Sequence, residues 1–187
     1  MNTLFIDKKI DYLGSQLVPH WIYRNFGILG DAAVAFIGKA DVGLEAMVDL
    51  QDVMEKKPIY SPQMLHFLVE HFHNNLHLGI YQQRMLIICI KEELEKRGIQ
   101  VIRQGDDLYV GGRKLSVSIA TVSPVSILIH TGVNVLTAGT PLPTSGLAEL
   151  GVEDVKGFAQ NVMKKYSDEL SSIDEARCKV RGTGIGC

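Results

Sequence analysis

The sequence has few cysteines and no long apolar run. Cys89, Cys178 and Cys187 show no CxxC or other zinc-binding spacing, and an odd number cannot pair completely within one chain. We expect reduced thiols, with Cys89 buried. The longest apolar run, Met85–Ile90, is about a third of the ~20 residues that cross a bilayer. The first residues also lack the apolar stretch and cleavage site of a secretory signal, so we expect a cytoplasmic protein without a membrane segment.

An excess of positive charge is also absent. Nineteen basic residues stand against 21 acidic ones, and the formal net charge is −2. Proteins that coat nucleic acids carry a basic surface, so this balance disfavours that class. The hydrophobic content of 46% excludes a disordered chain. A length of 187 residues predicts a single domain, 1–187, that buries its own core.

The order of expected elements predicts an α+β fold with a mixed, largely antiparallel sheet. Strands are expected, from β-branched and aromatic content, at Thr3–Ile6, Ala33–Ile37, Met64–Phe72, Ile99–Arg103, Leu108–Val110, Leu115–Thr121 and Ile127–Val135. Apolar periodicity predicts helices at about Leu76–Arg97 and Glu153–Arg181, followed by a flexible tail at 182–187. Strands that follow one another directly, without regular βα alternation, are typical of an antiparallel sheet with helices packed on it.

The segment GDDLYVGGRKLSVSIAT, residues 105–121, carries the most informative pattern. If Gly111-Gly112 forms a two-residue turn, Tyr109 faces Lys114 and Asp107 faces Ser116. Strict alternation then puts five apolar residues on one face, Leu108, Val110, Leu115, Val117 and Ile119. The opposite face is built of Asp107, Tyr109, Lys114, Ser116, Ser118 and Ala120.

The strand SILIHTGVNV predicts a second polar row beside the first. His130, Gly132 and Asn134 share one parity, and a three-residue loop, 123–125, would pair even-numbered with even-numbered residues. Lys114, Ser116 and Ser118 would then share one floor with this row. Small polar side chains leave room for a ligand on such a floor, whereas a solvated sheet face is the alternative interpretation.

These two strands resemble the core motif of the biotin and lipoate protein ligase superfamily. In that superfamily an Asn-Asp pair precedes a hairpin, Gly-Arg-Lys leads into a strand of small residues, and a later strand resembles HTGVNV. The superfamily motif covers mainly residues 105–135. Over its full length the chain is similar to a small uncharacterised family within that superfamily, through VDLQD, MLHFLVEHF, QQR, GDDLY, RKLSVSIAT and IHTGVNV.

The resemblance implies a class II synthetase-like catalytic fold and the activation of a carboxylate. In such ligases the lysine matching Lys114 contacts both the acyl carboxylate and the α-phosphate of ATP. The matching positions make Lys114 and Asp107 the catalytic candidates, with Asp106 and Asp107 positioning Mg²⁺. Asp106 stands where the superfamily usually has Asn. The structural alternative is that Asp107 only pairs with Lys114.

The resemblance does not extend to the superfamily's Gly/Arg-rich phosphate and substrate loop. The corresponding region reads FIGKADVGLEAMVDLQD, residues 36–52. Related octanoyl transferases place a cysteine in a Pro-Cys-Gly context, where this chain has Pro143-Thr144-Ser145-Gly146. Two interpretations remain: an ATP-dependent ligase or acyltransferase, and a non-catalytic binding or regulatory module that keeps the fold. A tRNA-linked role rests on fold analogy alone, and the charge balance disfavours nucleic acid as a partner.

Further candidates lie outside the two strands. His66 and Glu70 share one parity beside the expected sheet, and we predict that they line the substrate pocket together with Arg84, which could grip an anion. The segment HFLVEHFHNNLH holds enough histidines for a metal site but lacks HExxH geometry. The expected partners are a small carboxylate or acyl ligand and an acceptor protein. Nothing in the sequence excludes a homo-oligomer.

Overall fold

The computed structural model describes residues 1–140 and 142–182. Its elements in chain order are β1 (Asn2–Ile6), α1 (Trp21–Phe26), β2 (Ala32–Val42), the 3-10 helix η1 (Leu44–Ala46), α2 (Leu50–Met54), β3 (Ile59–His71), α3 (Leu76–Glu95), β4 (Ile102–Gln104), β5 (Asp107–Val110), β6 (Arg113–Lys114), β7 (Ser116–Val122), β8 (Ile127–Leu136) and α4 (Val155–Lys179). Residues 183–187 of the predicted tail, with Cys187, lie outside the described residues. No helix in the described part is long and apolar enough to cross a membrane.

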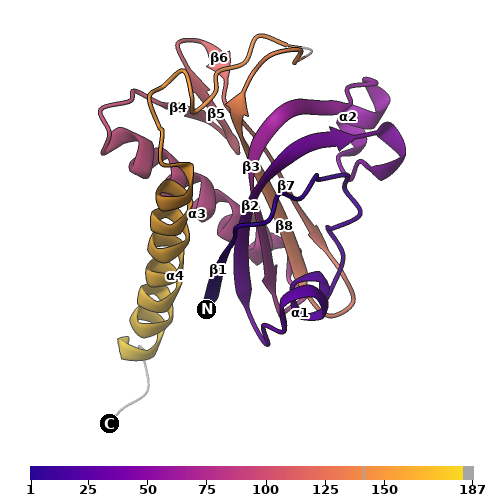
Figure 1. Ribbon diagram of the computed structural model, residues 1–187. Coiled ribbons are helices and arrows are strands. Elements are labelled where there is room, and N and C mark those ends of the chain that lie inside the picture. The colour runs from indigo at the N-terminus through magenta and orange to yellow at the C-terminus, as the bar shows by residue number, and fades with distance from the viewer. Residues whose placement is uncertain (141, 183–187) are drawn as a thin grey trace.

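A five-stranded sheet in the order β1-β2-β3-β8-β7 forms the centre of the fold (Figure 1). Only β1 and β2 pair in parallel, and the other neighbours are antiparallel. The prediction of an α+β fold with a mixed, largely antiparallel sheet is confirmed. A second sheet, β4-β5-β6, lies at one end of the large one.

One face of the large sheet is covered by α3 and α4 (Figure 1). Both helices begin at side-chain caps, since Asn75 accepts from the Leu78 amide and Asp154 accepts from the Gly157 amide. The sheet contributes fully buried residues such as Leu65 and Phe67 to the core on this face, and the helices contribute residues of the predicted apolar stripes. The helices expected at 76–97 and 153–181 are therefore confirmed within a few residues.

The opposite face is covered by the N-terminal segment, residues 7–30, and by η1 and α2. Tyr12 forms a parallel bridge with Ala40, which holds this segment against β2. The close approach depends on Gly38, because a Cβ atom there would lie 1.8 Å from the Ile10 carbonyl oxygen. The short β2 predicted at Ala33–Ile37 runs on to Val42 because this segment covers its extension.

The Gly111-Gly112 turn joins β5 to β6 as predicted. Both glycines have positive φ, 57° and 77°, and Tyr109 faces Lys114 across the hairpin. The prediction that the hairpin continues and that Asp107 faces Ser116 is wrong, because the chain leaves the hairpin after Lys114 and enters the large sheet, where β7 pairs with β8. Leu115 stays in the helix-side core, whereas Val117 and Ile119 turn to the other face, so the predicted apolar row is divided.

The register between β7 and β8 also differs from the prediction. Ile119 pairs with His130 and Val117 with Gly132, so odd-numbered residues face even-numbered ones. The connecting loop has four residues, Ser123 to Ser126, closed by a hydrogen bond from the Ser123 amide to the Ser126 carbonyl. The prediction that both strands share a single polar floor is therefore wrong. The Ser118 hydroxyl bonds to Thr131 on the helix side, away from the side chain of His130.

Candidate functional site

Two adjoining cavities lie on the face opposite the long helices. Cavity A has a volume of about 230 Å³ and cavity B about 170 Å³. Both are bounded by β7, by the start of β3 and by the segment that carries α2. They share five lining residues, Asp52, Lys57, Ile59, Lys114 and Val117.

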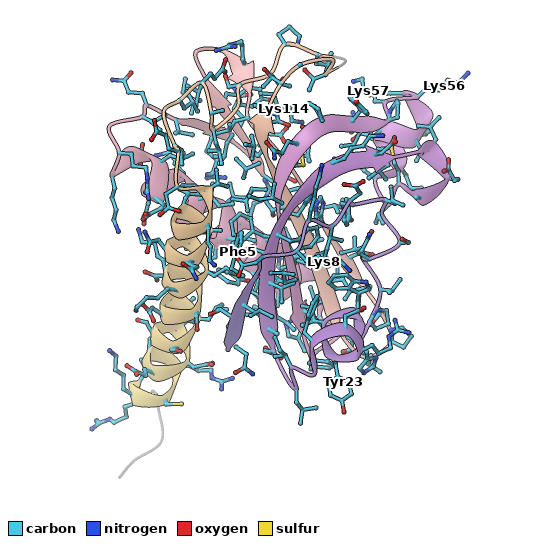
Figure 2. The ribbon with its side chains drawn as sticks, viewed as in Figure 1. Phe5, Lys8, Tyr23, Lys56, Lys57 and Lys114 are labelled. Atoms are coloured by element: carbon cyan, nitrogen blue, oxygen red, sulfur yellow. The ribbon has the colours of Figure 1, made fainter. Side chains whose placement is uncertain are left out.

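Lys114 stands on the wall between the two cavities. The β5–β6 hairpin fixes its backbone, and its carbonyl accepts a hydrogen bond from the Ser145 amide at 2.9 Å. Its Nζ lies 2.9 Å from Oδ2 of Asp107, and both side chains remain partly exposed. Figure 2 shows Lys114 at the same end of the sheet as Lys57. The hairpin thus presents one partly neutralised ammonium group to both cavities.

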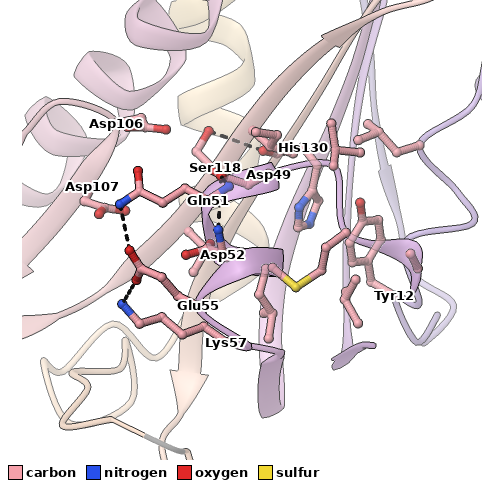
Figure 3. A pocket seen from close by; sticks show the side chains of 18 of the residues that line it. Tyr12, Asp49, Gln51, Asp52, Glu55, Lys57, Asp106, Asp107, Ser118 and His130 are labelled. Carbon is pink, nitrogen blue, oxygen red and sulfur yellow. Dashed lines mark hydrogen bonds and ion pairs between the residues drawn. The ribbon is translucent and has the colours of Figure 1, made fainter. Parts of the chain in front are cut away.

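The mouth of cavity A is acidic. Asp49 caps the short helix α2 by accepting from two backbone amides, and Asp52 and Glu55 follow on the same segment (Figure 3). Burial and the nearby Asp49 carboxylate raise the pKa of Asp52, and Lys114 partly opposes them. Asp106 and Asp107 complete a set of five carboxylates against Lys57 and Lys114. None of the described lining residues is an arginine.

Two side chains of α3 hold Asp106 in place. Its Oδ1 accepts from Arg84 at 2.9 Å and its Oδ2 accepts from Gln83 at 3.1 Å. Burial raises the pKa of Asp106, and the Arg84 charge opposes that shift. Gln83 also donates to Ser118, which connects the helix, the hairpin and β7. Each oxygen of Asp106 thus accepts one hydrogen bond from α3, and Asp107 is paired with Lys114, so protein groups position both aspartates of the predicted magnesium site.

The inner end of cavity A is aromatic. His130 lines the cavity and stacks on Tyr12, with the ring centroids 3.7 Å apart. Behind it His66 places Nδ1 3.0 Å from Nε2 of His130. Burial lowers the pKa of His66 to about 4 and that of His130 well below its usual range. Both imidazoles are therefore neutral at pH 7. In Figure 3 the labelled charged residues gather at one end of the pocket and Tyr12 and His130 at the other.

The structure brings most of the predicted site residues to the cavities. Lys114, Asp106, Asp107, Ser118 and His130 line cavity A, and Ser116 and Asn134 line cavity B. Ser118 borders cavity A at the edge strand β7, although its hydroxyl bonds to Thr131 on the helix side. Four predicted residues border neither cavity in the described part of the chain, namely His66, Glu70, Gly132 and Arg84. Arg84 lies outside the cavities because it pairs with Asp106. Gly132 is covered by Met64, since a Cβ atom at Gly132 would lie 2.1 Å from Sδ of Met64.

Glu70 has a structural role instead. Its carboxylate accepts from the His20 amide at 2.9 and 3.1 Å and from the Ser126 hydroxyl at 2.7 Å. It thus joins the start of α1 to the β7–β8 loop.

The histidine-rich segment does not gather ligands for a metal. His66 and Glu70 share one face of β3, as predicted, and His71 lies on the other face between Asp31 and Tyr166. His73 follows the strand and bonds to Gln82. The described residues contain no group of three or more histidine, cysteine or acidic side chains placed to hold a metal ion.

Sequence reasoning missed one wall of the site. The segment from Val42 to Ile59 supplies apolar contacts from Val42, Met47 and Val48 and the acidic residues of α2. Tyr12, which comes from the N-terminal segment, was missed as well. The signal was present in VDLQD, where an N-cap aspartate opens a short helix, but no local pattern indicates what that helix covers.

Comparison with known sequences gives relatives without an assigned function. Residues 1–181 match the family described as "Domain of unknown function (DUF366)". The uncharacterised protein MJ0805 of Methanocaldococcus jannaschii is 36% identical over 180 residues, which cover 93% of this chain and 81% of that protein. A protein of unknown function from Pyrococcus horikoshi has a solved structure with a TM-score of 0.92 at 44% identity, over 97% of this chain and 98% of the other.

More distant solved structures share the fold. A biotin protein ligase from Aquifex aeolicus, in complex with biotin and ATP, has a TM-score of 0.59 at 18% identity, covering 93% of this chain and 72% of the ligase. A lipoate-protein ligase A bound with ATP has a TM-score of 0.58 at 14% identity, covering 91% and 86%. The fold is therefore that of the biotin and lipoate protein ligases, as the sequence resemblance implies.

Proposed function

The chain belongs to the DUF366 family, and from the site of this member we propose that it binds a carboxylate-bearing acyl ligand against Lys114 and activates or transfers the acyl group there. The observation that carries the proposal is the position of Lys114 on the wall common to both cavities. An ammonium group held in a partly buried wall neutralises a carboxylate and the charge that develops when it reacts.

The two cavities suit two different parts of an acyl-transfer reaction. Cavity A combines charged residues near Lys114 with an apolar and aromatic interior, which suits an acyl chain whose carboxylate stays at the mouth. Cavity B reaches Lys114 from the other side and includes Asn134 and Thr140. A second reactant, such as a group of an acceptor protein, would approach through it.

ATP and Mg²⁺ fit the lining poorly. A triphosphate in cavity A would meet five carboxylates and two lysines, and both oxygens of Asp106 are already bonded to protein groups. The Gly/Arg-rich loop of the ligases has no counterpart in the sequence of residues 36–52, which runs instead into α2 and its acidic residues. Activation of a free carboxylate needs ATP as co-substrate, with pyrophosphate leaving as the acyl-adenylate forms. Transfer of an acyl group that arrives as a thioester needs neither ATP nor Mg²⁺, because the thiol is the leaving group. The acidic lining favours the second route, and ATP and Mg²⁺ enter as separate arms of the test.

A non-catalytic binding or regulatory module is the second candidate function. The acidic lining of cavity A favours it, since this lining opposes the nucleotide that adenylating ligases use. In this alternative Lys114 holds the carboxylate in the same way but no acyl group is transferred.

Calorimetry with octanoate, lipoate and biotin, each with and without ATP and Mg²⁺, tests the binding step. We expect at least one carboxylate to bind and Lys114→Ala to weaken it more than about tenfold. Lys57→Ala is the matched control, because Lys57 lines both cavities but pairs with Glu55 and is more exposed. Equal losses in both variants, or unchanged binding to Lys114→Ala, would contradict the assignment of Lys114.

Trapping with hydroxylamine separates the enzyme from the binding module. An activated acyl group yields a hydroxamate, whereas a bound but unactivated carboxylate does not. With the free acid plus ATP and Mg²⁺, or with the acyl group supplied as a thioester, we expect the wild-type protein to form hydroxamate faster than Lys114→Ala and faster than the reaction without protein. Binding of the acid without any such acceleration, from either acyl source, would establish the binding module.

A further inference from the structure

His130 offers one free ring nitrogen to cavity A. Its Nε2 is bonded to His66, and Nδ1 has no hydrogen-bond partner among the described residues. Among the described residues, the only fully buried side-chain nitrogen or oxygen without a hydrogen-bond partner is Nε2 of His66. Nδ1 of His130 also has no partner but is not such an atom, so it must be partly accessible. Because the residue is only 3% exposed and lines cavity A, that exposure is to the cavity.

The surroundings of His66 decide which ring nitrogens carry protons. The backbone groups of Gly38 and Lys39 act to raise the pKa of His66 against the larger effect of burial, because their carbonyl oxygens favour a protonated ring nitrogen. Nε2 of His66 nevertheless has no partner within hydrogen-bond distance. Nδ1 is committed to His130, so this proton belongs on Nε2, and Nδ1 accepts the N–H of His130. His130 then carries its proton on Nε2, and its Nδ1 presents a lone pair to the cavity.

The free nitrogen lies far from Lys114 along the sheet. The Asn134 amide donates to the carbonyl of Leu115, next to Lys114, so Lys114 lies beside that end of β8. His130 is four residues away on the same strand, which is about 13 Å at ~3.3 Å per residue. Apolar side chains, among them Leu17, Val42 and Ile119, line the cavity as well. A desolvated charge is costly in such surroundings, whereas a neutral donor is not.

We propose that the ligand of cavity A is a linear carboxylic acid whose far end carries a neutral hydrogen-bond donor, a hydroxyl group, received by Nδ1 of His130. This inference rests on the proposed function, because it takes the carboxylate to be held at Lys114. Tyr12 and His66 are positioning residues: Tyr12 stacks on the imidazole, and His66 fixes its protonated nitrogen.

Calorimetry with four eight-carbon acids tests the donor. They differ only at the far end: octanoate, 8-hydroxyoctanoate, 8-aminooctanoate and suberate. We expect 8-hydroxyoctanoate to bind about five- to tenfold more tightly than octanoate, the difference that one neutral hydrogen bond makes, and the two charged ends to bind more weakly. Leucine fills a similar space but accepts no hydrogen bond, so His130→Leu should bring octanoate and the hydroxy acid within about twofold of each other.

The outcomes separate this inference from the proposed function. Lys114-dependent binding of all four acids without a preference for the hydroxyl overturns the inference and leaves the proposed function standing. Tighter binding of suberate or of 8-aminooctanoate also overturns it. If the wild-type protein binds none of the four, both fail for this class of ligand.

Nitrogen NMR of the free protein checks the same point without a ligand and without a substitution in the site. With ¹⁵N-labelled histidine, we expect His130 to show a protonated Nε2 and an unprotonated Nδ1. The opposite tautomer would make His130 a donor and overturn the proposal. His66→Leu gives a positioning readout, because leucine offers no acceptor behind His130, so the two tautomers of His130 should mix while octanoate still binds.

Discussion

The two faces of the large sheet differ in the polar groups that β3 buries along them. On the helix side β2 and β3 contribute an apolar row, Ala33, Ala35, Leu65, Phe67 and Val69, packed beneath α3 and α4, and the buried His71 follows at the end of β3. On the cavity side the same strands contribute a second apolar cluster, with Val34, Phe36 and Leu68, and β3 adds the buried polar residues His66 and Glu70, each bonded to a named partner. Both faces gain stability from apolar burial, and the cavity side also holds buried polar groups within the strand through specific hydrogen bonds behind the site.

Removal of a large side chain from the helix side should have the largest effect on stability. Phe67 is fully buried in the core under α3 and α4. We expect Phe67→Ala to lower the free energy of unfolding by about 3–5 kcal/mol, because a cavity remains where the ring was. Urea denaturation measures this loss. Phe72→Ala is the matched control, because Phe72 is 40% exposed, and it should change stability little. Similar losses in the two variants would contradict the division between the faces.

Removal of the Glu70 carboxylate on the cavity side should lower the free energy of unfolding by less, through the loss of its hydrogen bonds. Glu70→Leu keeps a side chain of similar size but removes the oxygens that accept from the His20 amide and the Ser126 hydroxyl. We expect a loss of about 1–3 kcal/mol, measured by urea denaturation, from the donors left unsatisfied. Glu55→Leu, in an exposed ion pair with Lys57, is the control. Unchanged stability of Glu70→Leu would leave this carboxylate free for the ligand role that the sequence predicted.

The smallest expected effect depends on pH and lies on the helix side. His71 connects Asp31 to Tyr166 of α4 through contacts of 2.9 Å on each side. Burial alone would raise the pKa of Asp31, but the hydrogen bonds from His71 and the Phe72 amide lower it below 3.8. A depressed pKa stabilises the fold above the unfolded value, and this contribution is lost as the pH falls through the folded one.

Asp31→Asn should therefore lower stability by about 1 kcal/mol at pH 7, and the difference from the wild type should shrink below about pH 4. Urea denaturation at a series of pH values measures it. Asp7→Asn breaks the exposed pair with Lys156 and should show a smaller difference at every pH. A difference for Asp31→Asn that is constant from pH 7 to pH 3 would show that its charge is not the cause.

Much of the fold followed from local patterns. The apolar stripes predicted α3 and α4 because side chains three and four apart share a helix face, and Gly111-Gly112 predicted a hairpin because both positions need positive φ. The motif around Lys114 predicted the residue on which the proposed function rests. Alternation along the strand failed after Lys114, since the chain changes partner there and leaves the hairpin for the large sheet.

The sequence by itself determined the helices, the turn and the candidate lysine, because each depends on neighbours a few residues away. Only the tertiary structure decided which polar residues share a cavity. One extra residue in the loop from Ser123 to Ser126 shifts the register of β7 against β8 and turns the Ser118 hydroxyl to the helix side, so Ser118 borders cavity A only at the edge of the sheet. The segment from Val42 to Ile59 and Tyr12 complete the site through contacts between residues far apart in the sequence, which no local pattern encodes.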